Sequence, residues 1–352
     1  MATIVAEHIG RLFISLQHIR QVPRMLTEAA PSMPATVRDF DVPAYLRDSH
    51  ISSGYRQLHQ SWRYYFLSVF QRHNETLNVW THLVALLVIL AKFCDLAENV
   101  DFVNDRHAWP LLILLVSSLN YTAFSVIAHL LGSKSELCHF IFFYLDYVGV
   151  AQYQYGSAVV HFYYAIDASM YSYFKGVFMP AAAICSLLSF VGCCYGKYNN
   201  LQTLIRKIGH VAPSALAYAW DISPVVKRLI FWSDASNDPA LVFHLGQVAF
   251  FLSAAVFYTF PIVERCFPGQ CNFLGQSHQI FHIFLSCTTL CQINASYLDY
   301  LGRKELYLSL HASGDAAFFA QLYAATLMAC MFTGGIILRK LNVVLDLKHK
   351  CL

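Results

Sequence analysis

The sequence predicts an all-α membrane protein, a bundle of eight transmembrane helices, and two features of the chain lead to this fold class. Hydrophobic residues make up 57% of the 352 residues and charged residues only 13%, whereas soluble domains are about half apolar and about a quarter charged. The apolar residues also gather in runs of roughly 20, the length that a helix needs to cross a bilayer. A soluble core cannot bury this much apolar surface.

Seven runs qualify as membrane spans on hydropathy alone. In chain order they cover residues 77–94, 110–131, 140–162, 177–195, 241–263, 276–298 and 316–338. An eighth run, 208–231, is weaker because it contains two prolines and three charged residues.

Three histidines decide whether the weak run crosses the membrane. His129 ends the second span, whereas His278 and His282 begin the span at 276–298. If the three share a site, an even number of crossings must separate them. The strong runs between them number three, so residues 208–231 are expected to cross as well, which gives eight spans.

The distribution of Lys and Arg close to the span ends predicts that both termini are cytoplasmic. The N-terminal region, the loops at Lys134 and Lys197 and the C-terminal tail are rich in these residues and fall on one side. The opposite side carries the acidic stretch 95–105, although Arg303 and Lys304 do not follow the rule.

This topology divides the chain into three parts. Residues 1–76 form a cytoplasmic region in which apolar residues at helical spacing within 4–19 favour a helix on the membrane surface, and a partly ordered tail is the alternative. Residues 77–338 form the transmembrane domain, and residues 339–352 form a short basic cytoplasmic tail.

The strongest local signal is His278-Gln-Ile-Phe-His282, because imidazoles four residues apart lie on one face of a helix. In a soluble helix such a pair more often makes structural hydrogen bonds, but polar side chains within a membrane span usually mark a functional site or a buried network. His129 ends its span at the same leaflet. Three imidazoles with an open fourth position are typical of a catalytic or exchangeable zinc site, and a zinc ion that only joins the helices is the alternative.

Other polar residues are expected at the same depth. Ser125 lies four residues before His129, and Asp146 lies about two turns into the next span. We predict that these two side chains orient a water or an imidazole beside the metal. Glu75, Asn78 and His82 share one helical stripe at the start of the first span. Four spans thus bring polar residues to one level.

Asp221, between the prolines of the weak span, is a second carboxylate inside the membrane. Such a group needs a partner. We expect an ion pair with Lys227 or Arg228, and contact with a ligand is the alternative.

In these motifs the chain resembles the progestin and adipoQ receptor family. The shared elements are Glu75-Thr-Leu-Asn78, Ser125-Val-Ile-Ala-His129, Asp146 with its neighbours in Leu-Asp-Tyr, and His278-Gln-Ile-Phe-His282. The stretches SGYRQLHQSWRYYF, HNETLNVWTHL, FFYLDYVGV and DISPVV resemble the membrane progestin receptor branch, and MPATVRDFDVP and LDYLGRKE lean toward its beta subtype.

The resemblance implies an adiponectin-receptor-like core of seven helices plus one C-terminal helix, with zinc held by His129, His278 and His282. It implies a receptor in the plasma membrane for progesterone-like steroids, signalling rapidly through heterotrimeric G proteins and cyclic AMP, with a role in the resumption of oocyte meiosis. The steroid-contacting residues do not follow from it.

Three functions therefore compete. The first is a steroid receptor, which requires an apolar cavity with polar ends. The second is a zinc-dependent hydrolase of a membrane lipid amide, resembling the ceramidases, in which Asp146 assists proton transfer. The third is a scaffold with structural zinc. A nucleic-acid partner is not expected, because the net charge is only +3 and no basic stripe is interleaved with aromatic residues.

Overall fold

The computed structural model describes residues 33–198, 204–231 and 238–350. The chain divides into the units Met1–Ala35 and Thr36–Leu352, and all the elements below belong to the second unit. The surface helix expected at 4–19 lies outside the described residues.

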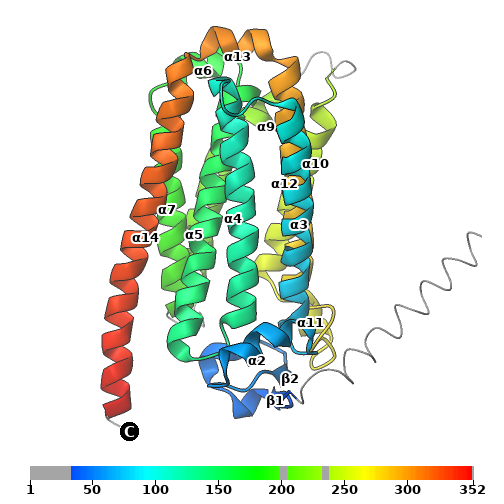
Figure 1. The fold of residues 1–352 in the computed structure, drawn as a ribbon, viewed down its shortest axis with the longest axis vertical. Helices are drawn as coiled ribbons and strands as arrows, with labels where there is room; N and C mark the ends of the chain where they lie inside the picture. Colours follow the sequence, from blue (N-terminus) through cyan, green and yellow to red (C-terminus); the bar gives the residue numbers. More distant parts are fainter. Residues whose placement is uncertain (1–32, 199–203, 232–237, 351–352) are drawn as a thin grey trace, which may run out of the picture. The chain divides into compact units, whose positions relative to one another are not determined.

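Long helices form most of the second unit and run side by side (Figure 1). They are α3 (Thr76–Asn99), α4 (Trp109–Leu131), α5 (Glu136–Val160), α7 (Phe178–Tyr198), α8 (Leu204–Asp221), α10 (Leu241–Thr259), α12 (Ser277–Gly302) and α14 (Ser313–Lys350). A π-helical turn, η5 (His161–Ala165), extends α5, and α9 (Ser223–Ile230) follows α8.

Short elements cover the two ends of the bundle (Figure 1). At the lower end of Figure 1 lie the antiparallel strands β1 (Val37–Arg38) and β2 (Ser53–Tyr55) with α2 (Trp62–Leu67) and α11 (Ile262–Cys266). At the other end lie α6 (Ala168–Phe174) and α13 (Lys304–Leu310). Single turns complete the set: η1 (Asp39–Asp41), η2 (Ala44–Leu46), η3 (Ser68–Phe70) and η4 (Arg106–Ala108).

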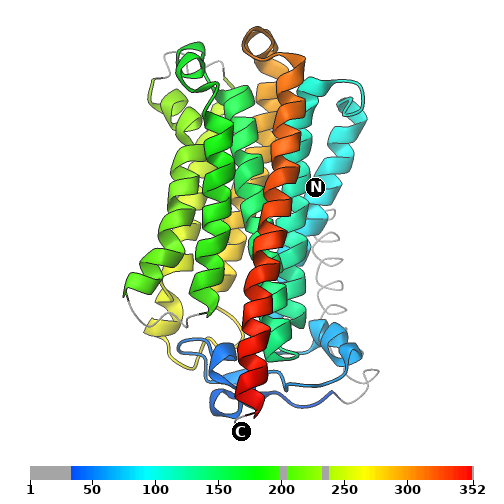
Figure 2. The same ribbon diagram turned by 90° about the vertical axis from the view of Figure 1, so that its left-hand side faces the viewer.

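The helices pack as a ring with one helix outside it. Neighbouring contacts run from α3 to α4, α5, α7 and α8, continue through α9 to α10 and α12, and return to α3. Helix α14 packs on the outer side of the ring, against α5 and α7 (Figure 2). This arrangement agrees with the predicted core of seven helices plus one C-terminal helix.

Five described helical segments are long and apolar enough to cross a membrane: 76–99, 106–131, 178–197, 241–259 and 314–345. Many of their apolar side chains are exposed, as expected of lipid-facing surfaces. Examples are Leu87 on α3, Val242 on α10 and Phe332 on α14, which are 57%, 66% and 73% exposed. The protein is therefore a multi-pass membrane protein. The segments α5, α8 and α12 are not among the five, so the crossing number of eight stays a prediction.

The predicted division of the chain at residues 76 and 338 stays a prediction, and two structural facts describe the ends of the helical domain. Residues 36–75 belong to the same compact unit as the helices, because they fold over the end of the bundle. Helix α14 continues to Lys350, through residues that were predicted to form a short tail. No proline or glycine stands between Leu338 and Lys350 to end the helix.

Two glycines bring α5 unusually close to α4. A Cβ atom at Gly149 would lie 2.7 Å from the Cα atom of Tyr121, and one at Gly156 would collide with Ser117 Oγ. Small residues at such positions let helix backbones approach closely within a membrane. This contact fixes α4, which carries His129, against α5, which carries Asp146.

The ion pair predicted for Asp221 is wrong. Its carboxylate instead accepts hydrogen bonds from Ser157 Oγ (3.3 Å) and His161 Nδ1 (3.1 Å). Helix α8 ends at Asp221 and α9 begins after it, so the helical spacing that would align Asp221 with residues 227 and 228 is interrupted. Lys227 pairs with Asp167, and Arg228 pairs with Asp238 and Asp299.

Candidate metal centre

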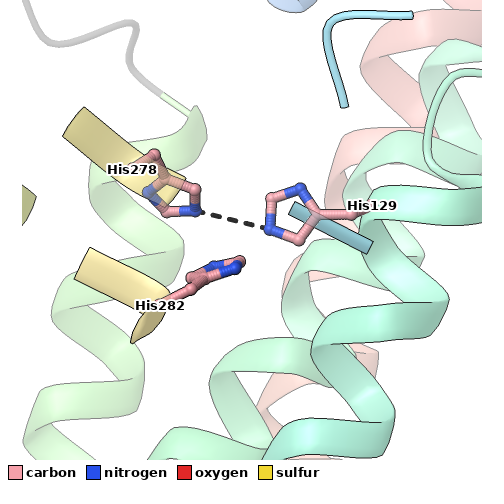
Figure 3. A group of neighbouring side chains, drawn as sticks. All are labelled: His129, His278 and His282. Carbon is pink, nitrogen blue, oxygen red and sulfur yellow. Dashed lines mark hydrogen bonds between the residues drawn. The ribbon is translucent and has the colours of Figure 1, made fainter. Parts of the chain in front are cut away.

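The structure brings together the three histidines that the sequence singled out. His129 lies in the last turn of α4, and His278 and His282 lie in the first turns of α12. One ring nitrogen from each lies within 4.8 Å of those of the other two. His129 Nε2 and His278 Nε2 are 3.4 Å apart, and the ring of His282 lies beside both (Figure 3).

A carboxylate fixes which nitrogen of His129 faces this cluster. His129 Nδ1 donates to Glu75 Oε2 at 2.7 Å, and Asn78 Nδ2 donates to the same oxygen at 2.6 Å. A carboxylate oxygen accepts, so Nδ1 is the nitrogen of His129 that carries the hydrogen in this bond. In the neutral imidazole the Nε2 lone pair of His129 is then left for a ligand bond.

His282 is oriented in the same way by α3. Its Nδ1 lies 3.0 Å from Thr81 Oγ1 and 3.2 Å from the Asn78 carbonyl oxygen. Its ring stacks on His82, with centroids 3.6 Å apart and an angle of 13° between the planes. Because Nδ1 is engaged by α3, the Nε2 atom of His282 is the one available to the cluster.

Side-chain hydrogen bonds fix the start of α12, which carries His278. Gly275 has a φ of +89°, which favours glycine, and its N–H donates to Gln279 Oε1. Gln276 donates to the Asn74 carbonyl oxygen at 3.0 Å. The Glu264 carboxylate accepts from the N–H and hydroxyl of Ser277 at 2.5 Å each. These contacts fix the first turn of α12 next to the start of α3.

Arg56, a residue that the motif analysis did not single out, holds the end of α4. Its side chain is buried and donates to the carbonyl oxygens of His129 (2.6 Å) and Leu130 (2.5 Å) and to Ser68 Oγ (2.8 Å). The last carbonyls of a helix lack partners within it and carry partial negative charge. Burial lowers the pKa of Arg56 to about 10, so the guanidinium remains charged at neutral pH.

The three histidines open onto a cavity of about 590 Å³ inside the ring. Cavities of roughly 300–1,000 Å³ hold small organic ligands. Its wall comes from residues 45–56 at one end and from α3, α4, α5, α7, α8, α10 and α12, whereas no described residue of α14 contributes to it. The middle is lined by apolar side chains such as Val150, Phe251, Ala254 and Leu285.

Both predicted neighbours of the metal, Asp146 and Ser125, line this cavity with the histidines. Asp146 is close enough to His129 and Lys197 for their charges to interact. Asp48 lies in the same wall, where burial, together with the nearby Glu75 carboxylate, raises its pKa to about 7.

The cluster has the features that a divalent metal ion requires. Two nitrogens bound to one tetrahedral zinc ion at about 2.0–2.1 Å lie roughly 3.3 Å apart, which matches the 3.4 Å between His129 Nε2 and His278 Nε2. Hydrogen bonds on Nδ1 select the free nitrogen of His129 and His282. The carboxylates of Glu75 and Asp146 in the same wall complement a positive ion. The donor set can therefore hold a metal.

The contributions of Thr81, Glu264 and Gln276 were not found from the sequence. Thr81 lies off the stripe formed by Glu75, Asn78 and His82, and Glu264 lies in a short helix that the chain pattern did not predict. The role of Arg56 could have been suspected from the sequence, because it is a charged residue in a stretch rich in aromatic residues just before the first span.

Comparison with known proteins gives consistent matches along the chain. Residues 70–293 match the family model described as haemolysin-III related. The chain is 49% identical to membrane progestin receptor alpha-B of Danio rerio, over 99% of this chain and 100% of that protein. It is 51% identical to membrane progestin receptor alpha of Cynoscion nebulosus, over 90% of each. It is 46% identical to membrane progestin receptor beta of Homo sapiens, over 88% of this chain and 89% of that protein.

Replacement of Arg56 tests whether it holds the end of α4. Arg56→Met should lower the free energy of unfolding by about 2–3 kcal/mol, because buried carbonyl groups lose their donors. Arg63→Met, at an exposed position of α2, is the matched control and should change stability little. Thermal unfolding of the purified proteins in detergent measures both. Equal stability of the two variants would show that the Arg56 contacts do not hold α4.

Proposed function

Since the chain belongs to the haemolysin-III related family and groups with its alpha and beta membrane progestin receptors, we propose that it is a membrane receptor for progesterone-like steroids. The observation that carries the proposal is the cavity inside the ring, which is apolar in its middle and polar at both ends. A flat apolar ligand with oxygen at its ends fits this distribution. The lean toward the beta subtype stays a prediction, because relatives named alpha and beta both match.

We further propose that His129, His278 and His282 bind a zinc ion. The support is the spacing of their ring nitrogens and the engagement of Nδ1 in His129 and His282. When bound, the ion supplies a Lewis acid at the end of the cavity. Glu75 holds His129 in the required tautomer, and Arg56 holds the backbone that carries it.

The cellular role proposed here follows the branch to which the chain belongs. The receptor resides in the plasma membrane with both termini in the cytoplasm, so that residues 36–75 and the end of α14 face the same compartment. Figure 1 has both at one end of the bundle. Steroid binding inside the ring favours one arrangement of this end, which couples to heterotrimeric G proteins and cyclic AMP. A role in the resumption of oocyte meiosis stays a prediction.

A second candidate is a zinc-dependent hydrolase of a lipid amide such as ceramide. The observation that favours it is the position of Asp146 and Ser125 in the wall that also carries the three histidines. In this function the Asp146 carboxylate takes a proton from the attacking water, and the amide bond breaks to give a fatty acid and an amine.

Metal analysis tests the zinc proposal. His278→Ala and His282→Ala should each reduce bound zinc from about one per protein to well below half, because loss of one of three ligands weakens binding strongly. The control is His311→Ala, which replaces a buried histidine that stacks on Tyr163 and does not belong to the cluster. This variant should retain zinc. Elemental analysis of purified protein gives the content. Unchanged zinc in both cluster variants contradicts the proposal.

Parallel assays separate the two functions. Zinc-loaded wild type should bind labelled progesterone saturably, and Asp146→Asn should retain both zinc and steroid. If wild type also cleaves ceramide, Asp146→Asn should lower that rate about 100-fold or more. Absence of saturable progesterone binding in folded, zinc-loaded wild type would refute the receptor function. Absence of ceramide cleavage by the same protein would refute the hydrolase function.

A further inference from the structure

Several buried polar atoms of the cavity wall have no hydrogen-bond partner in the part of the chain that the structure describes, and those of two residues, on α5 and α8, lie away from the histidine end. Tyr218 Oη on α8 and Gln154 Oε1 on α5 are buried atoms without a hydrogen bond, and both residues line the cavity. Buried polar atoms are nearly always paired. An unpaired one that faces a cavity therefore suggests a ligand group that pairs with it.

The two side chains lie at the same level of the bundle. Ser157 on α5 donates to Asp221 on α8, which places these two residues side by side. Helices α5 and α8 both run away from the histidine cluster, so they are parallel (Figures 1 and 2). Gln154 and Tyr218 each precede the contact by three residues, so both lie about 4.5 Å nearer to the histidines.

The polar groups beyond this level already satisfy one another. Gln292 Nε2 donates to Ser157 Oγ at 2.5 Å and lies 3.1 Å from His161 Nε2. His161 also contacts Asp221 (3.1 Å) and Gln247 (3.3 Å). A ligand would have to break these bonds to use them. This hydrogen-bonded network closes the end of the cavity away from the histidines. Gln154 and Tyr218 lie next to it on the histidine side, each with an atom that makes no hydrogen bond.

The position of Tyr218 is fixed by stacking. Its ring lies on Phe251, with centroids 3.6 Å apart and an angle of 13° between the planes, and Phe251 also lines the cavity. The hydroxyl is therefore held in one place before any ligand binds, which reduces the entropy that binding costs.

The distance between the two polar ends of the cavity limits the length of a ligand that reaches both. Gln154 follows Asp146 by eight residues on α5, a rise of about 12 Å, and apolar side chains such as Val150 and Leu285 line the wall. The hydroxyl of Tyr218 can donate to a ketone or hydroxyl oxygen. The Gln154 amide can accept from a hydroxyl through Oε1, or donate to a ketone after rotation of its end group.

We propose that Gln154 and Tyr218 form a polar subsite that binds one oxygen, of a ketone or hydroxyl group, on an otherwise apolar ligand in the cavity. The identity of that ligand as a steroid rests on the proposed function, whereas the subsite itself rests on the unpaired atoms and their common level.

The test uses three purified variants. Tyr218→Phe and Gln154→Leu remove the unpaired groups. Tyr155→Phe is the matched control, because its hydroxyl donates to the Phe319 carbonyl oxygen at 3.1 Å and it is not part of the cavity wall. In the ligand-free state Tyr155→Phe should lower the melting temperature, whereas Tyr218→Phe should leave it unchanged or raise it.

The second arm measures affinity for progesterone and for two analogues that lack either the C3 or the C20 oxygen. Tyr218→Phe and Gln154→Leu should weaken progesterone binding about tenfold, and Tyr155→Phe should not. For one of the two analogues the loss caused by Tyr218→Phe should vanish, since the oxygen that pairs with the hydroxyl is missing.

The outcomes separate the subsite from the proposed function. If wild type binds progesterone and both cavity variants bind it equally well, the subsite is overturned and the receptor function stands. If wild type binds no progesterone, the receptor function is refuted, and the melting temperatures of the ligand-free proteins then test the subsite. A melting temperature of Tyr218→Phe as low as that of Tyr155→Phe then overturns the subsite, and an unchanged or higher one supports a subsite for an oxygen on another apolar ligand.

Discussion

The hydrogen bond between His129 Nδ1 and the Glu75 carboxylate joins the end of α4 to the start of α3 and decides which imidazole nitrogen faces the cavity. The rest of the histidine cluster is built against this bond. Helix α3 also supplies Thr81 and the Asn78 carbonyl to His282, and Arg56 holds the backbone of His129 from the other side. The three imidazoles are thereby arranged so that their lone pairs point to one place. These buried lone pairs need a partner, and a metal ion can be that partner.

The cavity connects this point to the interior of the ring. Close contact between α4 and α5 at Gly149 and Gly156 closes one wall. Polar residues of α5, α8 and α12 line the inside, whereas α3, α10 and α14 expose many apolar side chains outward. The polar network around His161 and Asp221 closes the inner end. A membrane bundle must satisfy its polar groups internally, and here they are gathered at two levels with an apolar space between them. A receptor and a lipid hydrolase could both use that space, and the chemistry near His129 distinguishes them.

Much of the fold could be predicted from the chain because the bilayer imposes a length and a polarity on each span. The requirement that His129 meet His278 and His282 predicted a membrane crossing over residues 208–231. The structure has helices there, broken after Asp221, and the crossing itself stays a prediction. Pairing that depends on where a helix ends could not be predicted, which is why Asp221 was assigned to the wrong partners. The roles of Thr81, Glu264 and Gln276 depend on the packing of α3 against α12, and no local pattern encodes such a contact. The positions of Asp146 and Ser125 in the cavity wall followed from helical spacing, and their roles remain proposals.

X-ray absorption spectroscopy at the zinc edge of the purified protein tests the central claim most directly, because it reports the atoms bound to the metal without any substitution. The account predicts three imidazole nitrogens at about 2.0–2.1 Å and a fourth light atom, with no sulfur. Sulfur at about 2.3 Å, fewer than three imidazoles, or protein that takes up no zinc would contradict the claim that His129, His278 and His282 form one metal centre.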